Sequence, residues 1–253
     1  MNIKTQINPI RYIYSIYGLM LLVAFLIALF PFALLVLFLR KPLGGNLFYK
    51  VASEYARCWL FFMRIHYKEL YIEHSVFNKK EAAIYIANHQ SYIDIILMLS
   101  VMNTPFRPLG KDQMSKIPVF GFFYDRLVIT VNRESSTSKI QSLLSLSKTL
   151  EAGMSVFIFP EGTFNETTSP LKIFRTGAFQ LAIKKRVTIR PLLFLDSKDR
   201  MHYSSLLSMR PGPCRVAFLK EIHSNCQQKT EQLKDKVFET MKQALLEFRP
   251  LGY

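Results

Sequence analysis

The sequence predicts an α/β fold in which a mixed, largely parallel sheet is flanked by helices, with an N-terminal hydrophobic helical membrane anchor ahead of it. Two observations carry this expectation. From Tyr67 onward, short β-like runs alternate with helical stretches, as they do in α/β layer folds. Before that point, the 28 residues between Arg11 and Arg40 carry no formal charge. We therefore expect membrane-anchoring helices over residues 1–66 and an α/β domain over residues 67–253.

The uncharged N-terminal segment is long enough to be a membrane anchor. As a helix it would extend for about 42 Å, and a hydrocarbon core is about 30 Å thick. It is too long for a cleavable signal peptide, and Pro31 leaves a kink or a half-buried hairpin open. The positive-inside rule places the main domain on the cytoplasmic side of the membrane. The basic residues behind this orientation are Arg40, Lys41, Lys50 and Arg57 after the segment, against Lys4 and Arg11 before it.

The next segment is predicted to be a helix with one charged side. Lys50, Glu54, Arg57 and Arg64 fall within an arc of roughly 80° on a helical wheel. Glu54 can pair with Lys50 and Arg57 at this spacing, and Gly44-Gly45 supplies the break from the first helix. Such a helix lies in the membrane interface or packs on the first helix. An ordinary buried helix of the α/β domain is the alternative.

The composition favours anionic partners. Lys and Arg number 33 against 18 for Asp and Glu, which gives a formal charge of +15, and the mean hydropathy is +0.14. Phospholipid headgroups, phosphorylated substrates and nucleic acid all fit such a charge. Nucleic acid fits least, because no zinc-finger spacing or RNP-like motif is present. The three cysteines, Cys58, Cys214 and Cys226, are widely spaced and indicate reduced thiols in a cytoplasmic setting.

The expected elements of the α/β domain follow from apolar runs and their periodicity. Strands are predicted over residues 67–72, 82–87, 106–109, 127–132, 155–159, 188–194 and 215–222. Helices are predicted over residues 92–102, 118–125, 138–152, 177–185 and 230–248. The last helix repeats apolar residues at Leu233, Val237, Met241, Ala244 and Phe248, which predicts one buried stripe.

A histidine and an aspartate lie where a predicted strand gives way to a predicted helix. One interpretation is structural: Ser91 caps the helix, and Asp94 completes a capping box three residues later. The other is chemical: His89 takes a proton from a hydroxyl of the substrate, and Asp94 accepts a hydrogen bond from the other ring nitrogen. Taken alone, the pair favours the structural interpretation. A metal site at His89 and Asp94 lacks a third ligand at suitable spacing, so no metal is expected.

Residues further along the chain favour the chemical interpretation. Lys111 stands beside a predicted helix start, Arg133 follows an apolar run, and Arg175 precedes a helix. The turn Glu161-Gly162-Thr163 follows another apolar run. Cations and helix N-terminal amides at strand ends suit a phosphate monoester. The order of these groups, each near the end of an apolar run, is the argument for a phosphate site.

The motifs together resemble those of the PlsC-like glycerolipid acyltransferases, a family typified by 1-acyl-glycerol-3-phosphate acyltransferase. The resemblance covers roughly residues 82–194. Residues 88–94 are similar to the first block of the family, residues 111–121 with Arg133 to the second, residues 159–163 to the third, and residues 187–192, more loosely, to the fourth.

The resemblance implies a membrane-bound transfer of a fatty acyl group to the free hydroxyl of a lysophospholipid, most simply 1-acyl-glycerol 3-phosphate giving phosphatidic acid. The donor would be acyl-CoA or acyl-carrier protein, used as a co-substrate without a cofactor. His89 would be the general base and Asp94 its orienter. The binding residues would be Arg133, Glu161, Gly162 and Thr163 at the glycerol phosphate, Lys111 and Arg175 as added candidates from the charge pattern, and Pro191 at the acyl-donor pocket.

Three residues depart from the family pattern. Phe164 stands where the family often has arginine, Asn132 where aspartate is frequent, and Arg190 where a small apolar residue is usual. The first two fall in the acceptor region, so lyso-ornithine lipid or lysophosphatidylethanolamine remains open as the acceptor. Two less favoured functions are a lipid or thioester hydrolase and a non-catalytic lipid-binding protein. The sequence lacks Gly-x-Ser-x-Gly, which disfavours a serine α/β-hydrolase.

Overall fold

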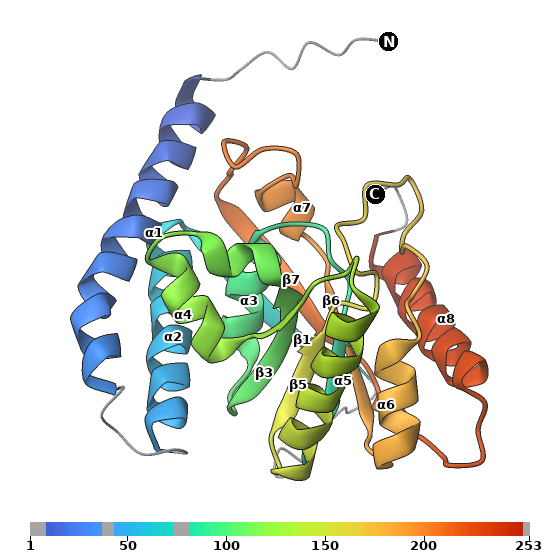
Figure 1. Ribbon diagram of the computed structural model, residues 1–253. Helices are drawn as coiled ribbons and strands as arrows, with labels where there is room; N and C mark the ends of the chain where they lie inside the picture. Colours follow the sequence, from blue (N-terminus) through green and yellow to red (C-terminus); the bar gives the residue numbers. More distant parts are fainter. Residues whose placement is uncertain (1–8, 37–42, 73–80, 250–253) are drawn as a thin grey trace.

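The computed structural model describes residues 9–36, 43–72 and 81–249, which fold around one seven-stranded sheet (Figure 1). The sheet order is β1-β7-β6-β2-β5-β3-β4. Strands β2 to β6 run parallel, β7 is antiparallel to β6, and β1 is parallel to β7. The mixed, largely parallel sheet expected from the sequence is confirmed. The strands are β1 Ile65–Tyr71, β2 Ile84–Ala87, β3 Phe106–Lys111, β4 Ile129–Val131, β5 Ser155–Ile158, β6 Ile189–Phe194 and β7 Gly212–Phe218.

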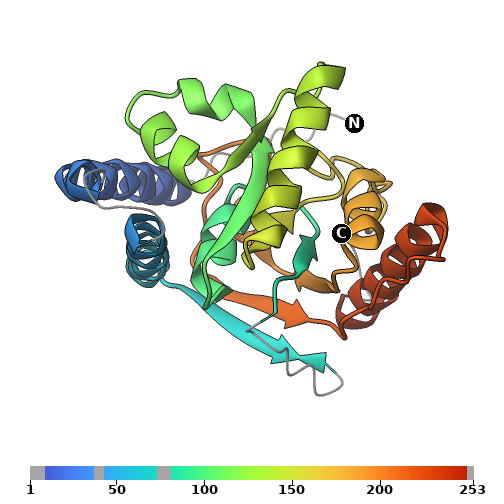
Figure 2. The ribbon, with the colours of Figure 1, turned by 60° about the horizontal axis from the view of Figure 1, so that its bottom comes forward.

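Helices cover both faces of the sheet (Figure 2). The helices α2 and α3 pack on one face with the side chains of Tyr85 and Ala87, and α5, α6 and α8 pack on the other with Ile84 and Ile86. Both faces of β2 are therefore buried, which explains its uninterrupted apolar sequence. The helical elements are α1 Pro9–Val36, α2 Leu43–Phe62, α3 Ile93–Val101, η2 Asp112–Lys116, α4 Phe120–Leu127, α5 Ser136–Glu151, α6 Gly177–Lys185, α7 Ser197–Arg200 and α8 Thr230–Phe248. The short elements η2 and α7 were not expected.

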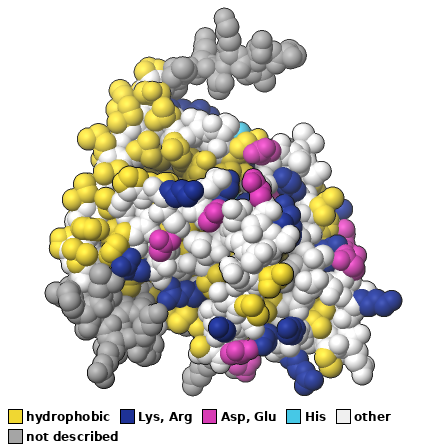
Figure 3. Space-filling view, in the orientation of Figure 1, with side chains coloured by type: hydrophobic (Ala, Val, Ile, Leu, Met, Phe, Trp, Pro, Cys, Tyr) yellow, Lys and Arg dark blue, Asp and Glu magenta, His cyan; other side chains and the backbone are white. Residues whose placement is uncertain are grey.

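Helix α1 is the one helix in the described part of the chain that is long and apolar enough to cross a membrane. It continues through Pro31 to Val36, so the alternative of a hairpin within this segment is not formed. Its inner side packs on α2, where Trp59 Nε1 donates to Gly18 O at 3.0 Å. Its outer side exposes a row of apolar side chains, and hydrophobic residues gather there in Figure 3. Lys4, Arg40 and Lys41, which the predicted orientation in the membrane partly rests on, lie outside the described residues.

Helix α2 lies between α1 and the sheet domain. Trp59 and Leu60 are fully buried against the core shared with α3. On the charged side, Arg57 pairs with Glu54 and its Nε donates to Ser100 O at 3.1 Å. The helix thus packs on the first helix, which was one of the expected arrangements. The expected break at Gly44-Gly45 is wrong, because α2 already begins at Leu43.

Candidate active site

Four of the predicted site residues lie at one edge of the sheet. The strands β2, β5, β3 and β4 are parallel neighbours, so their carboxyl ends lie side by side. His89 follows β2, Glu161 follows β5, Lys111 ends β3, and Arg133 follows β4. Open α/β sheets bind ligands at this edge, because side chains that follow the strands converge there.

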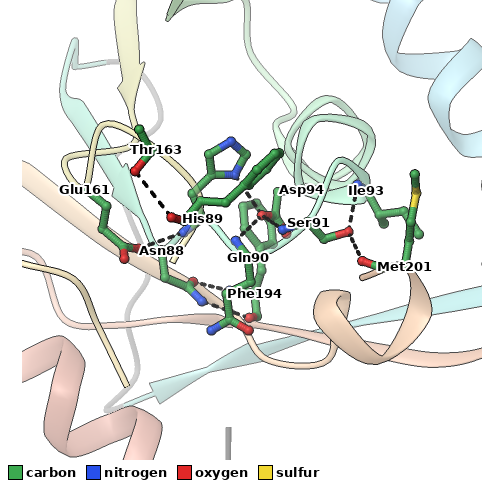
Figure 4. A network of polar contacts seen from close by, with 11 residues as sticks. Asn88, His89, Gln90, Ser91, Ile93, Asp94, Glu161, Thr163, Phe194 and Met201 are labelled. Carbon is green, nitrogen blue, oxygen red and sulfur yellow. Dashed lines mark hydrogen bonds and ion pairs between the residues drawn. The ribbon is translucent and has the colours of Figure 1, made fainter. Parts of the chain in front are cut away.

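His89 and Asp94 form the pair that the chemical interpretation requires (Figure 4). His89 Nδ1 lies 2.9 Å from Asp94 Oδ2, and the same oxygen accepts the backbone N–H groups of Gln90 at 2.7 Å and Ser91 at 2.8 Å. Asp94 is buried in the first turn of α3, and one of its oxygens holds the two amides that precede the helix while it orients the imidazole. A carboxylate accepts a hydrogen bond from Nδ1–H, so the proton stays on Nδ1 and the lone pair lies on Nε2. No described residue bonds Nε2, so that nitrogen is available to a substrate.

The imidazole of His89 lies in an aromatic slot that the sequence did not predict. The ring of Phe159 stacks on it at a centroid distance of 4.1 Å, and the ring of Phe164 lies at 4.3 Å. Phe164 also contacts Tyr92 at 4.7 Å and Tyr203 at 6.2 Å. The sequence did contain a hint of this slot, because Phe159 and Phe164 flank the Pro160–Thr163 stretch. Their contact with His89 depends on how the loop after β5 folds back.

Glu161 faces the protein interior. Its Oε1 accepts the backbone N–H of His89 at 2.8 Å, and its Oε2 accepts that of Lys172 at 2.9 Å. Burial raises the pKa of Glu161 to about 7, against the opposing effect of these two hydrogen bonds. With both oxygens bound to backbone amides, the carboxylate holds the His89 loop in place. The geometry gives it this positioning role in place of the expected contact with the acceptor phosphate.

The guanidinium groups of Arg133 and Arg175 interact with one another, and Arg175 lies against Gly162. Gly162 has a φ of +78°, and a Cβ built on it would lie 2.5 Å from Arg175 Nε, so glycine permits the close approach of Arg175. Burial, and then the nearby charge of Arg175, lower the pKa of Arg133. Neither guanidinium forms an ion pair with a described residue. A bound anion would relieve their mutual repulsion.

Lys111 and Thr163 complete the predicted set. Lys111 is exposed, and in the sheet it pairs with Val131 of β4. Val131 comes two residues before Arg133 in the chain. Thr163 is also exposed, and its Oγ1 accepts from Lys172 Nζ at 2.8 Å. No motif singled out Lys172, which reaches the site through the fold of the loop after β5. This loop therefore brings one more cation to the strand ends.

The departure at Asn132 has a simple structural account. Its Oδ1 accepts the backbone N–H of Glu134 at 3.0 Å, a turn that aspartate forms equally well. Its own N–H donates to Ser138 Oγ at 2.9 Å, near the start of α5. The asparagine thus shapes the turn that carries Arg133.

Arg190 and Pro191 lie away from the catalytic pair. Arg190 is buried near the amino end of β6, where its Nε lies 3.2 Å from Glu221 Oε2 and its Nη1 lies 3.2 Å from the hydroxyl of Tyr85. Pro191 is buried beside it, opposite Ile86 of β2. The difference from the family pattern at Arg190 therefore lies in the interior of the sheet, away from His89 and Asp94. The role of Pro191 in a donor pocket remains a prediction.

The fold and the contact between His89 and Asp94 define an α/β protein with a histidine–aspartate pair at the sheet edge that also carries several cations. The chain belongs to the acyltransferase family, whose model matches residues 68–195. It is 31% identical over 161 residues to the chloroplastic 1-acyl-sn-glycerol-3-phosphate acyltransferase LPAT1 of Arabidopsis thaliana, covering 63% of this chain and 45% of that one. It is 32% identical over 128 residues to the 1-acyl-sn-glycerol-3-phosphate acyltransferase of Salmonella typhimurium, covering 49% and 51%. The matched stretch thus spans about half the length of these relatives.

A solved structure shares the fold. The 1-acyl-sn-glycerophosphate acyltransferase PlsC from Thermotoga maritima superposes with a TM-score of 0.79 at 18% identity. The match covers 95% of this chain and 97% of that chain, so it includes the N-terminal helices as well as the sheet.

Proposed function

We propose that this protein transfers a fatty acyl group from acyl-CoA or acyl-carrier protein to the free hydroxyl of 1-acyl-glycerol 3-phosphate, giving phosphatidic acid. The observation that carries the proposal is the 2.9 Å contact between His89 Nδ1 and Asp94 Oδ2 at the carboxyl end of β2, in a chain of the acyltransferase family. The names of the relatives support the acceptor.

The reaction is a direct attack with acceptor and donor bound together. His89 Nε2 takes the proton as the acceptor oxygen forms a bond to the thioester carbonyl carbon, and Asp94 stabilises the imidazolium. The carbon–sulfur bond then breaks, and the thiolate leaves with the electron pair and takes up the proton. General base catalysis contributes about 10² to 10⁴-fold, or roughly 3 to 5 kcal/mol of the barrier.

The acceptor phosphate is assigned to the guanidinium groups of Arg133 and Arg175. The charge of Arg175 acts on Arg133, and neither guanidinium forms an ion pair with a carboxylate in the described part of the chain, which supports this assignment. Lys111 and Lys172 add positive charge at the same strand ends. The apolar helix α1 supports a place at a membrane. The sheet domain would lie on the cytoplasmic side by the positive-inside rule.

The test uses the purified full chain, a panel of lysolipids and both donor types, with products identified by mass spectrometry. We expect phosphatidic acid from 1-acyl-glycerol 3-phosphate, and loss of transfer in His89→Ala while the protein stays folded. The matched control is His223→Ala, an exposed histidine outside the site. Wild-type turnover by His89→Ala would remove the assignment of the base, and release of free fatty acid alone would indicate a hydrolase.

Arg133→Ala tests the acceptor. Loss of a charged hydrogen bond to phosphate is worth about 1.5 to 3 kcal/mol, so KM for the phosphate acceptor should rise about 10 to 100-fold. A lysolipid without a phosphate should be unaffected. An equal loss with both acceptors would place Arg133 elsewhere in the mechanism.

A further inference from the structure

A strained turn joins η2 to α4. Val119 has a φ of 63° and a ψ of −55°, a conformation that a β-branched residue rarely adopts. The turn is closed by Phe120 N–H donating to Pro118 O at 2.7 Å and by Gly121 N–H donating to Ile117 O at 2.7 Å. Strained backbone that the surroundings hold in place is a reason to look for a function.

The turn points apolar side chains outward. Ile117 is 43% exposed and Val119 is 42% exposed, and Pro118 between them is exposed as well. We call these three residues the 117–119 tip. Lys116, directly before it, is also exposed. Single exposed apolar residues are ordinary, but three consecutive ones on a strained turn beside a lysine fit an interface between hydrocarbon and phosphate.

The tip leads directly into helix α4, which packs on α1. Phe122 and Phe123 of α4 contact Phe30 of α1 at ring-centroid distances of 5.3 and 6.4 Å. The outer side of α1 is apolar along its described length, as the hydrophobic surface in Figure 3 shows. This continuity with α1, together with the formal charge of +15, selects a lipid bilayer with anionic headgroups as the partner.

We propose that the 117–119 tip inserts into the membrane leaflet as a second contact beside α1, with Lys116 at the headgroups. The tip is connected through η2 to Lys111 at the end of β3. Two contacts fix the tilt of the sheet domain against the lipid surface, which one helix alone would leave free. On the proposed function, this tilt holds the cation cluster at the depth of the acceptor phosphate.

The test locates single labels in the full chain. Exposed Cys58 and Cys226 are replaced by serine, buried Cys214 is kept, and a bimane fluorophore is attached to Ile117→Cys or Val119→Cys. The vesicles contain phosphatidylcholine and phosphatidylglycerol with brominated acyl chains. We expect loss of fluorescence at both tip positions and at Ile27→Cys on the outer side of α1. Ile140→Cys on α5, which is 60% exposed, is the matched control and should keep its fluorescence.

Fluorescence at the tip that stays as high as at Ile140 overturns the proposal, whatever the label on α1 does. Protection of the tip label from a water-soluble quencher before vesicles are added also overturns it, because the tip would then be covered by protein. These readouts do not require catalysis. Failure of the proposed function therefore leaves them intact.

Val119→Gly separates a membrane role from a structural one. Glycine adopts the turn without strain, so thermal unfolding should occur at the same or a higher temperature. The apolar side chain is lost, so quenching of the Ile117→Cys label should decrease. A lower unfolding temperature with unchanged quenching would show that Val119 serves the fold instead. On the proposed function, Ile117→Ser with Val119→Ser should raise KM for a vesicle-embedded acceptor and leave a short-chain monomeric acceptor unaffected.

Discussion

At the scale of single residues, Glu161 explains how the base is held. A carboxylate can satisfy two backbone N–H groups from different loops, and here it joins the loop of His89 to that of Lys172. Glutamine has the same shape but offers one oxygen and one NH₂ group. In Glu161→Gln, the NH₂ group would meet a backbone N–H, so one of the two loops would lose its partner.

The buried carboxyl also predicts a pH dependence of stability. The pKa of Glu161 is raised from 4.5 to about 7, so the folded protein holds this proton more tightly than the unfolded chain. The protonated carboxyl contributes on the order of 3 kcal/mol to the free energy of unfolding. This contribution is present below pH 4.5 and is lost as the pH rises through about 7. Denaturant unfolding of the wild type and Glu161→Gln at pH 4.5 and pH 8 measures it. The wild type should lose more stability than the variant, and equal losses would contradict the prediction.

Phe164 should affect turnover through His89. The imidazole becomes cationic during proton transfer, and an aromatic ring stabilises a cation by about 0.5 to 2 kcal/mol. Phe164→Leu should therefore lower kcat by about 2 to 30-fold with little change in KM, while Phe164→Tyr keeps the rate. Phe61→Leu is the control, since this exposed ring lies on α2. A rise in KM with constant kcat would assign Phe164 to substrate binding instead.

At the scale of elements, α1 approaches the residues that follow α2 closely at a glycine. A Cβ on Gly18 would lie 2.4 Å from Met63 Cε and 2.9 Å from Met209 Sδ, which are flexible side-chain ends that could move for a methyl group but leave no room for a larger side chain. Gly18→Leu should separate the helices and strain the bond from Trp59, at a cost of about 1 to 3 kcal/mol. A lower unfolding temperature in detergent would report it. Ala28→Leu, on the outer side of the same helix, should leave that temperature unchanged.

The existence of the seven strands could be predicted because most are short runs rich in apolar residues, bounded by polar residues or turns. Their ends could not, since β1 begins at Ile65 and β7 at Gly212, before the predicted residues 67 and 215. The antiparallel direction of β7 could not, since direction depends on the connection through α7 and not on local pattern. At the site, the order of the motifs predicted which residues gather at the strand ends. It could not predict that Glu161 turns inward or that Phe164 covers His89, because both follow from the path of the loop after β5.

At the scale of the whole molecule, α1 lies along the domain instead of projecting from it (Figure 1). Its inner side contacts the domain from Tyr14, which donates to Met63 O, to Phe30. Were the helix to cross a bilayer upright, the polar loops packed along it would enter the hydrocarbon, where backbone groups find no partners. The packing therefore favours a helix that lies along one face of the membrane, with its outer side in the lipid.

The position of β1 has a consequence for the synthesis of the chain. In the described structure, β1 pairs only with β7, whose first residue, Gly212, lies opposite Ile65. A ribosome that adds about 5 to 20 residues per second makes β1 on the order of ten seconds before its partner. During that interval the backbone N–H and C=O groups of β1 are unpaired. The charges of Lys68 and Glu69 disfavour pairing of this strand with other chains. The rate of translation therefore determines how long the nascent chain exposes an unpaired strand that could aggregate.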